Sequence, residues 1–255
     1  MCELLGMSAN VPTDITFSFS GLMERGGHTG PHKDGWGIAF YEGRACRSFR
    51  DPHPSAESEI AKLIQRYPIK SLTVISHIRK ATHGKISLEN THPFHRELWG
   101  RQWTFAHNGK LKGIKKRRLE FYKPVGSTDS EHAFCWIMDN IRRRWPDKAP
   151  RPSSLIRHVE TLAKDLHGLG IFNMLMSDSR HLFCFCGTNL HWITRKAPFG
   201  KASLLDAEMA VDFHQETTPN DIVSVVATKP LTGDETWAAI PKGNLLTLLD
   251  GVVVR

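Results

Sequence analysis

Long hydrophobic runs are missing from this sequence. No stretch approaches the roughly 20 consecutive apolar residues that a membrane-spanning helix needs. The first residues also lack the basic segment and apolar core of a secretory signal peptide. These absences argue against a helical membrane protein and against export, so we expect a cytoplasmic protein with no membrane partner.

Cysteine is scarce, and its spacing shows no pairing pattern. The chain contains 5 cysteines, an odd number, and no C-x-x-C pair. Neither a disulfide framework nor a zinc ribbon is therefore indicated. Cys184 and Cys186 lie in the apolar stretch HLFCFC, which is typical of a buried strand, and we expect both to be core thiols.

A nucleic-acid-binding signature is also lacking, although the formal net charge is +8. Basic residues concentrate in KLKGIKKRRLE (110–120) and IRRRWP (141–146), and few aromatic residues interleave with them. We therefore expect a solvated loop and a helix C-terminus rather than a nucleic-acid interface. A basic surface would equally favour anionic substrates.

Metal-ligand spacing is absent despite 14 histidines. Imidazole is a common metal ligand, so a metal hydrolase is the alternative from another chemistry. No H-E-x-x-H or comparable spacing occurs, however, and we expect neither a metal site nor a cofactor. The histidines that cluster in sequence are His77, His83, His92, His95 and His107.

Many short strands and few helices are predicted. Few helical segments separate neighbouring strands, which favours antiparallel sheets in one α+β domain over residues 1–255. We expect two sheets face to face with helices outside. The predicted strands are 2–9, 36–49 as a hairpin, 71–78, 102–109, 171–178, 181–186, 191–195, 221–228 and 244–254, and the predicted helices are 14–23, 55–68, 127–144 and 152–168.

Several boundaries carry their own predictions. Residues 79–100 are expected to be a long turn-rich region, and the strand that follows is expected to break at Asn108-Gly109. Thr128 and Glu131 have capping-box spacing. Gly168 is expected to end a helix, and Asp250-Gly251 to turn a hairpin.

The chain starts with MCELLGMSAN, which places a cysteine directly after the initiator methionine. Cytosolic processing usually removes Met1 when the second side chain is small. The mature chain would then expose a thiol and a free α-amino group on Cys2, a nucleophile and a base on one residue. The α-amino group has a reference pKa of about 7.7–8.0, near working pH.

Other polar residues match what hydrolysis of the glutamine side-chain amide requires. The Asn108 amide and the Gly109 N–H could form an oxyanion hole. Arg79 offers a planar fork for an α-carboxylate, and Asp129 could accept from an α-ammonium. Each also has an ordinary interpretation: a surface ion pair for Arg79, a turn for Asn108-Gly109 and a helix cap for Asp129.

Taken together, Cys2 and four motifs, HIRKATHG (77–84), HPF (92–94), HNG (107–109) and STDSE (127–131), resemble the class II glutamine amidotransferases of the N-terminal-nucleophile hydrolase superfamily. The resemblance is strongest to their short stand-alone YafJ-type branch. It is strong from Cys2 to Glu131 and looser through ATKPLTGDETW (227–237) to the end. It implies a four-layer αββα sandwich of two mainly antiparallel sheets.

The resemblance also implies residue roles. Cys2 would attack the side-chain amide of glutamine to give a glutamyl thioester, and water would release glutamate. The other implied roles are carboxylate binding by Arg79, pocket lining by Thr82 and His83, the oxyanion hole by Asn108 and Gly109, α-amino binding by Asp129, and a position near the active site for Arg25, Gly26 and residues 34–37.

Two departures leave alternatives open. Sugar-phosphate aminotransferases have tryptophan after the pocket arginine, whereas this sequence has Lys80. No synthase domain is expected within residues 1–255. Either a separate protein accepts the ammonia, or the enzyme hydrolyses other γ-glutamyl amides such as glutathione-like peptides. A third alternative, a non-catalytic glutamine sensor, is disfavoured by the intact Cys2.

Overall fold

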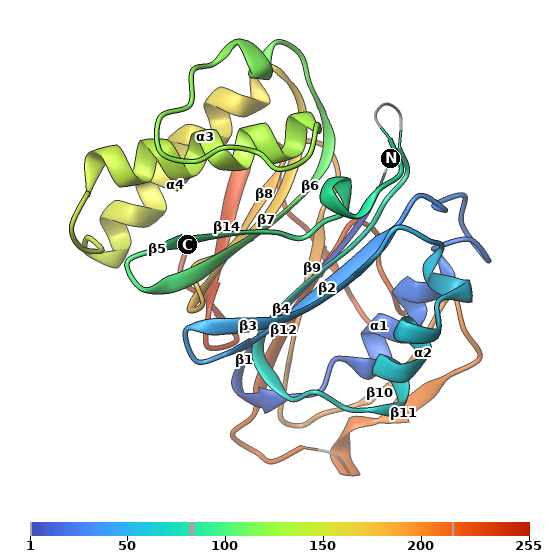
Figure 1. Cartoon of the computed structure of the whole chain (residues 1–255). Coiled ribbons are helices and arrows are strands. Elements are labelled where there is room, and N and C mark those ends of the chain that lie inside the picture. Colours follow the sequence, from blue (N-terminus) through green and yellow to red (C-terminus); the bar gives the residue numbers. More distant parts are fainter. Residues whose placement is uncertain (1, 82–84, 216) are drawn as a thin grey trace.

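The computed structural model describes residues 2–81, 85–215 and 217–255. Two antiparallel sheets face each other (Figure 1). The first has seven strands in the order β13-β9-β12-β1-β4-β2-β3. Their bounds are Glu3–Thr13 (β1), Trp36–Glu42 (β2), Ala45–Asp51 (β3), Ser71–Ile78 (β4), His191–Lys196 (β9), Ile222–Ala227 (β12) and Ala238–Ala239 (β13).

The second sheet has six strands in the order β15-β14-β8-β7-β6-β5. They are Phe94–Leu98 (β5), Arg101–Leu111 (β6), Gly170–Ser177 (β7), His181–Cys186 (β8), Asn244–Leu249 (β14) and Val252–Val253 (β15). A separate two-stranded ribbon pairs Lys201–Ser203 (β10) with Ala210–Asp212 (β11).

Helices cover the outer faces of both sheets (Figure 1). They are Thr16–Glu24 (α1), Glu59–Arg66 (α2), Asp129–Arg144 (α3) and Pro152–His167 (α4), with 3₁₀ turns at Ser55–Glu57, Leu88–Asn90, Ile114–Lys116 and Phe213–Gln215. No helix in the described ranges is long and apolar enough to cross a lipid bilayer.

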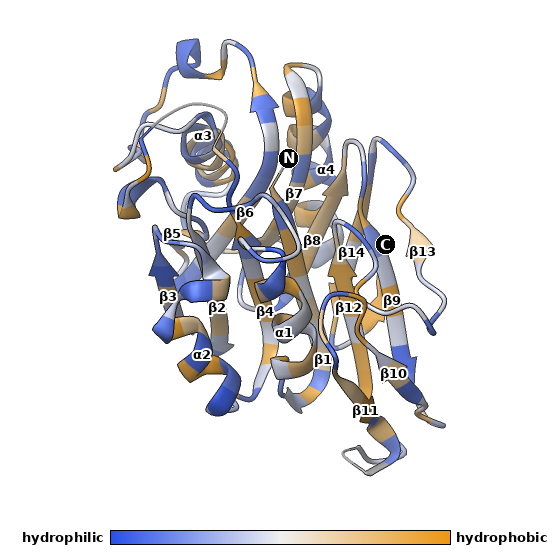
Figure 2. Cartoon of the chain, turned by 90° about the vertical axis from the view of Figure 1, so that its right-hand side faces the viewer, coloured by the Kyte–Doolittle hydropathy of each residue, from blue (hydrophilic) through white to orange (hydrophobic). Residues whose placement is uncertain are grey.

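Three apolar clusters hold the layers together. One packs α1 and α2 on the first sheet through residues such as Phe19 and Trp36, and a second packs α3 and α4 on the other sheet. The third lies between the sheets and includes Ile75, Ala106 and Leu175. Figure 2 shows hydrophobic colouring along the strands β8, β12 and β14 that this arrangement buries. The predicted α+β class, with two face-to-face antiparallel sheets and helices outside, is confirmed.

Two local predictions are also confirmed. Gly168 is the C-cap of α4. Asp250 and Gly251 adopt φ values of 49° and 75° and turn the β14–β15 hairpin. Both positive φ values are typical of the two-residue turns that match strand twist.

Two boundary predictions are wrong. The region 79–100 contains β5, which carries the charged sequence FHREL and therefore lacks a strong strand pattern. The next strand, β6, does not break at Asn108-Gly109 but runs on to Leu111 and pairs with β7. Gly109 does not form a turn. It allows the backbone of β7 to pass close to β6, because a Cβ at this position would lie 1.8 Å from the carbonyl oxygen of Ile171.

The predicted capping box at α3 is half correct. The Thr128 hydroxyl accepts from the Glu131 N–H at 3.1 Å. The Glu131 carboxylate does not return to Thr128, because it accepts from Arg96 (2.7 Å) and from the N–H groups of Val125 (2.9 Å) and Gly126 (2.7 Å). Glu131 therefore anchors the segment before the helix to β5.

Candidate active site

Strand ends from both sheets meet around Cys2. The antiparallel register pairs Glu3 of β1 with Ile78 of β4, so the residue before β1 lies beside the residues that follow β4. Arg79 and Lys80 are those residues. Asn108, from β6 of the opposite sheet, approaches the same point. The fold thus brings together segments that are far apart in the sequence.

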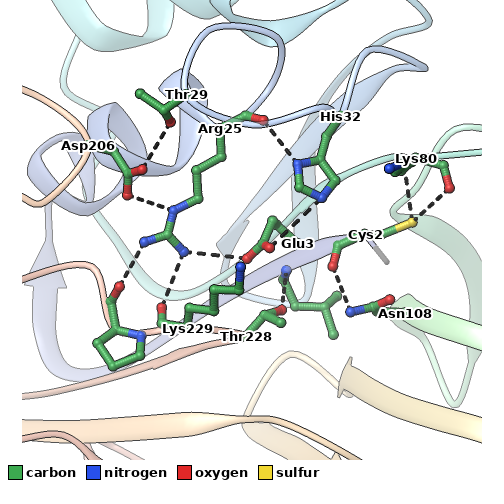
Figure 3. A network of polar contacts seen from close by, with 12 residues as sticks. Cys2, Glu3, Arg25, Thr29, His32, Lys80, Asn108, Asp206, Thr228 and Lys229 are labelled. Carbon is green, nitrogen blue, oxygen red and sulfur yellow. Dashed lines mark hydrogen bonds and ion pairs between the residues drawn. The ribbon is translucent and has the colours of Figure 1, made fainter.

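The Cys2 thiol is held by backbone groups (Figure 3). Its Sγ accepts from the Lys80 N–H at 3.2 Å and lies 3.5 Å from the Lys80 carbonyl oxygen. Burial raises the pKa of the Cys2 thiol, and the Lys80 hydrogen bond and the Arg79 charge offset only part of this effect. The thiol is therefore protonated at neutral pH, so nucleophilic attack requires a base to remove its proton.

Asn108 contacts the backbone of the cysteine. Its Nδ2 donates to the Cys2 carbonyl oxygen at 2.6 Å, and its Oδ1 is buried with no hydrogen-bond partner among the described residues. Asn173 of β7, which sequence analysis missed, supports this position by donating from Nδ2 to the Asn108 carbonyl oxygen at 3.1 Å. The Asn173 Oδ1 in turn accepts from the backbone N–H groups of residues 187–189.

Arg79 is 4% exposed and has neutral partners. Its Nη1 donates to the carbonyl oxygens of Asp34 (3.4 Å) and Lys85 (3.2 Å). The Asp34 carboxylate accepts instead from the Ala81 N–H at 2.7 Å. Burial lowers the pKa of Arg79, and the charges of Cys2 and Asp34 oppose that shift. A buried guanidinium whose partners are backbone carbonyl groups is suited to bind the carboxylate of a ligand by donating hydrogen bonds to it.

Asp129 is the first residue of α3 and is tied to β6. Its Oδ2 accepts from the Leu111 N–H at 2.8 Å and its Oδ1 from the Ser130 N–H at 3.0 Å. These contacts place Asp129 beside the strand that carries Asn108 and Gly109, but they do not join it to Cys2 directly. Thr82 and His83 lie outside the described residues.

A buried ionic network supports the start of β1 (Figure 3). Arg25 lies between two carboxylates, with Nη1 3.4 Å from Glu3 Oε2 and Nε 2.7 Å from Asp206 Oδ2. It also donates to the carbonyl oxygens of Lys229 (3.3 Å) and Pro230 (2.7 Å). Because Glu3 follows Cys2, this network anchors the chain directly beside the thiol.

From the sequence, Arg25 is expected near the active site, and in the structure it contacts Glu3, the residue that follows Cys2. Sequence analysis missed Glu3 and Asp206. No local pattern could reveal Asp206, because 181 positions separate it from Arg25. Thr29 binds the other oxygen of Asp206 at 2.9 Å and fixes its orientation.

Arg25→Gln should lower the free energy of unfolding by about 3–5 kcal/mol, because it leaves the buried carboxylate of Glu3 and the partly buried carboxylate of Asp206 without their arginine partner. Urea denaturation measures this change. The matched control is Arg47→Gln, since Arg47 is half-exposed and its ion pair with Glu42 lies at 3.5 Å on the surface. The control should stay within about 1 kcal/mol of the unchanged protein. Equal losses in the two variants would show that the network adds no stability.

Histidines beneath the site are buried and neutral. The His77 and His92 rings lie 4.1 Å apart, and their nitrogens have no hydrogen bond of ordinary geometry among the described residues. Burial, together with His107 and Arg79, lowers the pKa of His77 to about 3. The positions of His77 and His107 at predicted strand ends favour hydrogen-bonded rings, which is wrong for His77 and confirmed for His107. The His107 nitrogens lie 2.8 Å from Ser130 Oγ and 3.1 Å from the Ile171 carbonyl oxygen.

These histidines predict loss of stability in acid. The folded pKa of His77 lies below its ordinary value of 6.5, and that of His92 well below it, so the unfolded chain binds more protons below pH 6.5. The stability that each neutral ring contributes is complete above pH 6.5 and is lost as pH falls toward the folded pKa. Each histidine should cost about 1.4 kcal/mol per pH unit in that window.

Urea unfolding at pH 7, 6 and 5 tests this expectation. His77→Gln should flatten the pH dependence relative to the unchanged protein. The same slope in both proteins would contradict the assignment. Within the described ranges, no group of three or more His, Cys, Asp and Glu side chains is arranged to hold a metal ion.

Comparison with known proteins assigns the family. The family model described as "Glutamine amidotransferases class-II" matches residues 1–255. The chain is 59% identical over 243 residues to YafJ of Escherichia coli, named as a glutamine amidotransferase, and the match covers 95% of each protein. It is 45% identical over 251 residues to a Haemophilus influenzae protein named for the same activity, covering 98% of this chain and 85% of that protein.

A solved structure agrees over its whole length. The crystal structure of a predicted glutamine amidotransferase from Pseudomonas aeruginosa is 51% identical and has a TM-score of 0.79, with 100% of both chains covered. The αββα sandwich described above is therefore the N-terminal-nucleophile hydrolase fold. This chain belongs to the class II glutamine amidotransferases.

Proposed function

We propose that the protein hydrolyses the side-chain amide of glutamine through a glutamyl thioester on Cys2 and releases glutamate and ammonia. The observation that carries the proposal is the arrangement around the thiol. The Cys2 thiol contacts the Lys80 backbone, and the Asn108 side-chain amide lies 2.6 Å from the Cys2 carbonyl oxygen. The positive charge of Arg79 opposes the rise in the thiol pKa that burial causes, and so favours the thiolate. Family membership makes the side-chain amide of glutamine the first substrate to test.

The mechanism starts once Met1 has been removed. The α-amino group of Cys2 accepts the thiol proton as Sγ attacks the amide carbon. The tetrahedral oxyanion is stabilised by Asn108 Nδ2 and the Gly109 N–H. Collapse of this intermediate breaks the C–N bond and transfers the proton to the departing ammonia. Water then attacks the thioester, which releases glutamate and restores the thiol.

Head-group recognition is assigned to four residues. Arg79 would bind the α-carboxylate and Asp129 the α-ammonium, with Thr82 and His83 lining the pocket. The Arg79 guanidinium is suited to this role because its partners are neutral carbonyl groups. Arg79 is buried and Asp129 is partly buried, so the site favours a ligand that carries both counter-charges.

The second candidate is hydrolysis of other γ-glutamyl amides, such as glutathione-like peptides. It is favoured by Lys80. The backbone N–H of Lys80 contacts the Cys2 thiol, and Lys80 itself is exposed to solvent. No bulky aromatic side chain occupies this position, which leaves room for a leaving group larger than ammonia. If ammonia is instead captured, a separate accepting protein would take it.

Arg79→Gln should lower kcat/KM for glutamine by roughly 10- to 100-fold, because a charge-assisted contact to the carboxylate is lost. Release of glutamate measures this rate. The unchanged enzyme should cleave glutamine and leave glutarate monoamide intact, since that amide lacks the amino-acid head group. Arg47→Gln provides the control for a general loss of positive charge. Equal rates on both amides would remove the head-group roles of Arg79 and Asp129.

A further inference from the structure

A pocket with mainly apolar walls lies beside the segment that leads into α3. Its volume is about 440 Å³, within the range of roughly 300–1,000 Å³ that small-molecule sites occupy. The walls come from β3, the 3₁₀ turn at Leu88–Asn90, β5 and the start of α3. They are Arg50, Leu88, Glu89, Phe94, His95, Arg96, Val125 and Glu131.

Arg50 and Arg96 are the cations that line this pocket, and Arg50 has the fewer hydrogen bonds to the described residues. It is half-buried, and its Nη1 donates to the Thr91 carbonyl oxygen at 3.3 Å. Its stem crosses Gly37, where a Cβ would lie 2.9 Å from Arg50 Cγ, so the glycine lets the arginine reach this position. Burial lowers the pKa of Arg50, and the Glu131 charge opposes that shift.

Two acidic residues, Glu89 and Glu131, line the pocket, and both have other partners. The Glu89 carboxylate is hydrogen-bonded to its own backbone and to Ser87, which lowers its pKa. Glu131 accepts from Arg96 at 2.7 Å and from the N–H groups of Val125 and Gly126. His95 lies 3.4 Å from the Cys46 thiol and 3.0 Å from the Ser48 hydroxyl, and burial lowers its pKa to about 4, so it is neutral. A ligand would therefore meet the guanidinium of Arg50 and apolar groups, with the exposed Glu89 at the edge of the pocket.

One buried residue links this pocket to the substrate site. Asn90 is 1% exposed and adjoins the pocket residues Leu88 and Glu89. Its Nδ2 donates to the Lys85 carbonyl oxygen at 3.1 Å, which also accepts from Arg79 at 3.2 Å. Its Oδ1 accepts from the Ser127 N–H at 2.8 Å, just before Asp129 begins α3.

We propose that this pocket is a regulatory site for a small organic anion, whose carboxylate or phosphate group binds Arg50 and whose occupancy strengthens glutamine binding through Asn90. A ligand here contacts both the 88–89 turn and residues 125–131. It thereby holds together the two segments that support Arg79 and Asp129. Because the arrangement of the thiol is untouched, occupancy acts on KM and leaves kcat unchanged.

Isothermal titration calorimetry with inorganic phosphate and, separately, citrate tests the site at constant ionic strength set by chloride. We expect saturable binding of at least one anion, and the stronger ligand identifies the preferred group. Arg50→Gln and Leu88→Glu should each weaken binding about tenfold or more. Leu88 is 48% exposed, so its variant tests the pocket even if Arg50→Gln is unstable. Arg47→Gln, on the same strand, should bind like the unchanged protein.

The absence of saturable binding, or equal binding by all variants, would overturn the site. The predicted effect on KM rests on the proposed glutaminase activity, whereas anion binding measured by calorimetry does not. With the anion bound, KM for glutamine should fall at least threefold in the unchanged enzyme and stay constant in Leu88→Glu. An unchanged or raised KM at saturating anion would overturn the coupling through Asn90.

Discussion

Replacing Cys2 with alanine should reduce glutamate release from glutamine by about 10³-fold or more, because the substitution removes the attacking atom. The loss should occur in kcat, and the fold should be retained. The Cys2 thiol makes its described contacts with the Lys80 backbone alone, and β1 stays paired on both sides with β4 and β12. Steady-state kinetics and urea unfolding of the same variant measure both halves.

Cys46→Ala is the matched control for loss of a partly buried thiol. Cys46 is also free and of intermediate exposure, and its Sγ lies 3.4 Å from a ring nitrogen of His95. Burial raises its pKa to about 11, so it is a poor nucleophile at neutral pH. This variant should keep full activity. Substantial activity in Cys2→Ala, or a similar loss in Cys46→Ala, would remove Cys2 from the mechanism.

Asn108→Ala should lower kcat by about 10²–10³-fold with little change in KM, since one donor to the developing oxyanion is lost. The same substitution removes the 2.6 Å contact with the Cys2 carbonyl oxygen. The residue is buried in β6 and its carbonyl is held by Asn173, so the backbone should stay in place. Initial rates over a range of glutamine concentrations separate kcat from KM.

Asn140→Ala is the control for loss of an asparagine side chain outside β6, because Asn140 lies in α3. Its side chain donates to the Trp136 carbonyl oxygen within α3. The control should retain kcat and KM. If Asn108→Ala raised KM and preserved kcat, Asn108 would be a substrate-binding residue and the oxyanion role would have to be assigned to another group.

Short motifs allowed much of the candidate site to be predicted from the sequence. Cys2 precedes β1, Arg79 follows β4 and Asn108 lies within β6, and the structure brings the three together. The strand 71–78 and the helix cap at Gly168 were predicted with their observed ends. Such features depend on interactions between neighbours in the chain, which a sequence pattern reports directly.

Features that depend on distant contacts could not be predicted. β5 forms because β6 pairs with it, although its three central residues are polar or charged and only its ends are buried. The contacts of Arg25 with Glu3 and Asp206 join three separate parts of the chain, so no local pattern marks them. Gly109 was expected to turn the chain, but its role depends on the neighbouring carbonyl of Ile171.

The most direct test of the account is intact-mass and peptide mass spectrometry after reaction with the glutamine analogue 6-diazo-5-oxo-norleucine. The proposed mechanism predicts a mature chain without Met1 that carries one adduct, located on Cys2, with glutamine protecting against the reaction. An unmodified Cys2, a retained Met1 in fully active enzyme, or an adduct on another cysteine would contradict the assignment of Cys2 as the N-terminal nucleophile.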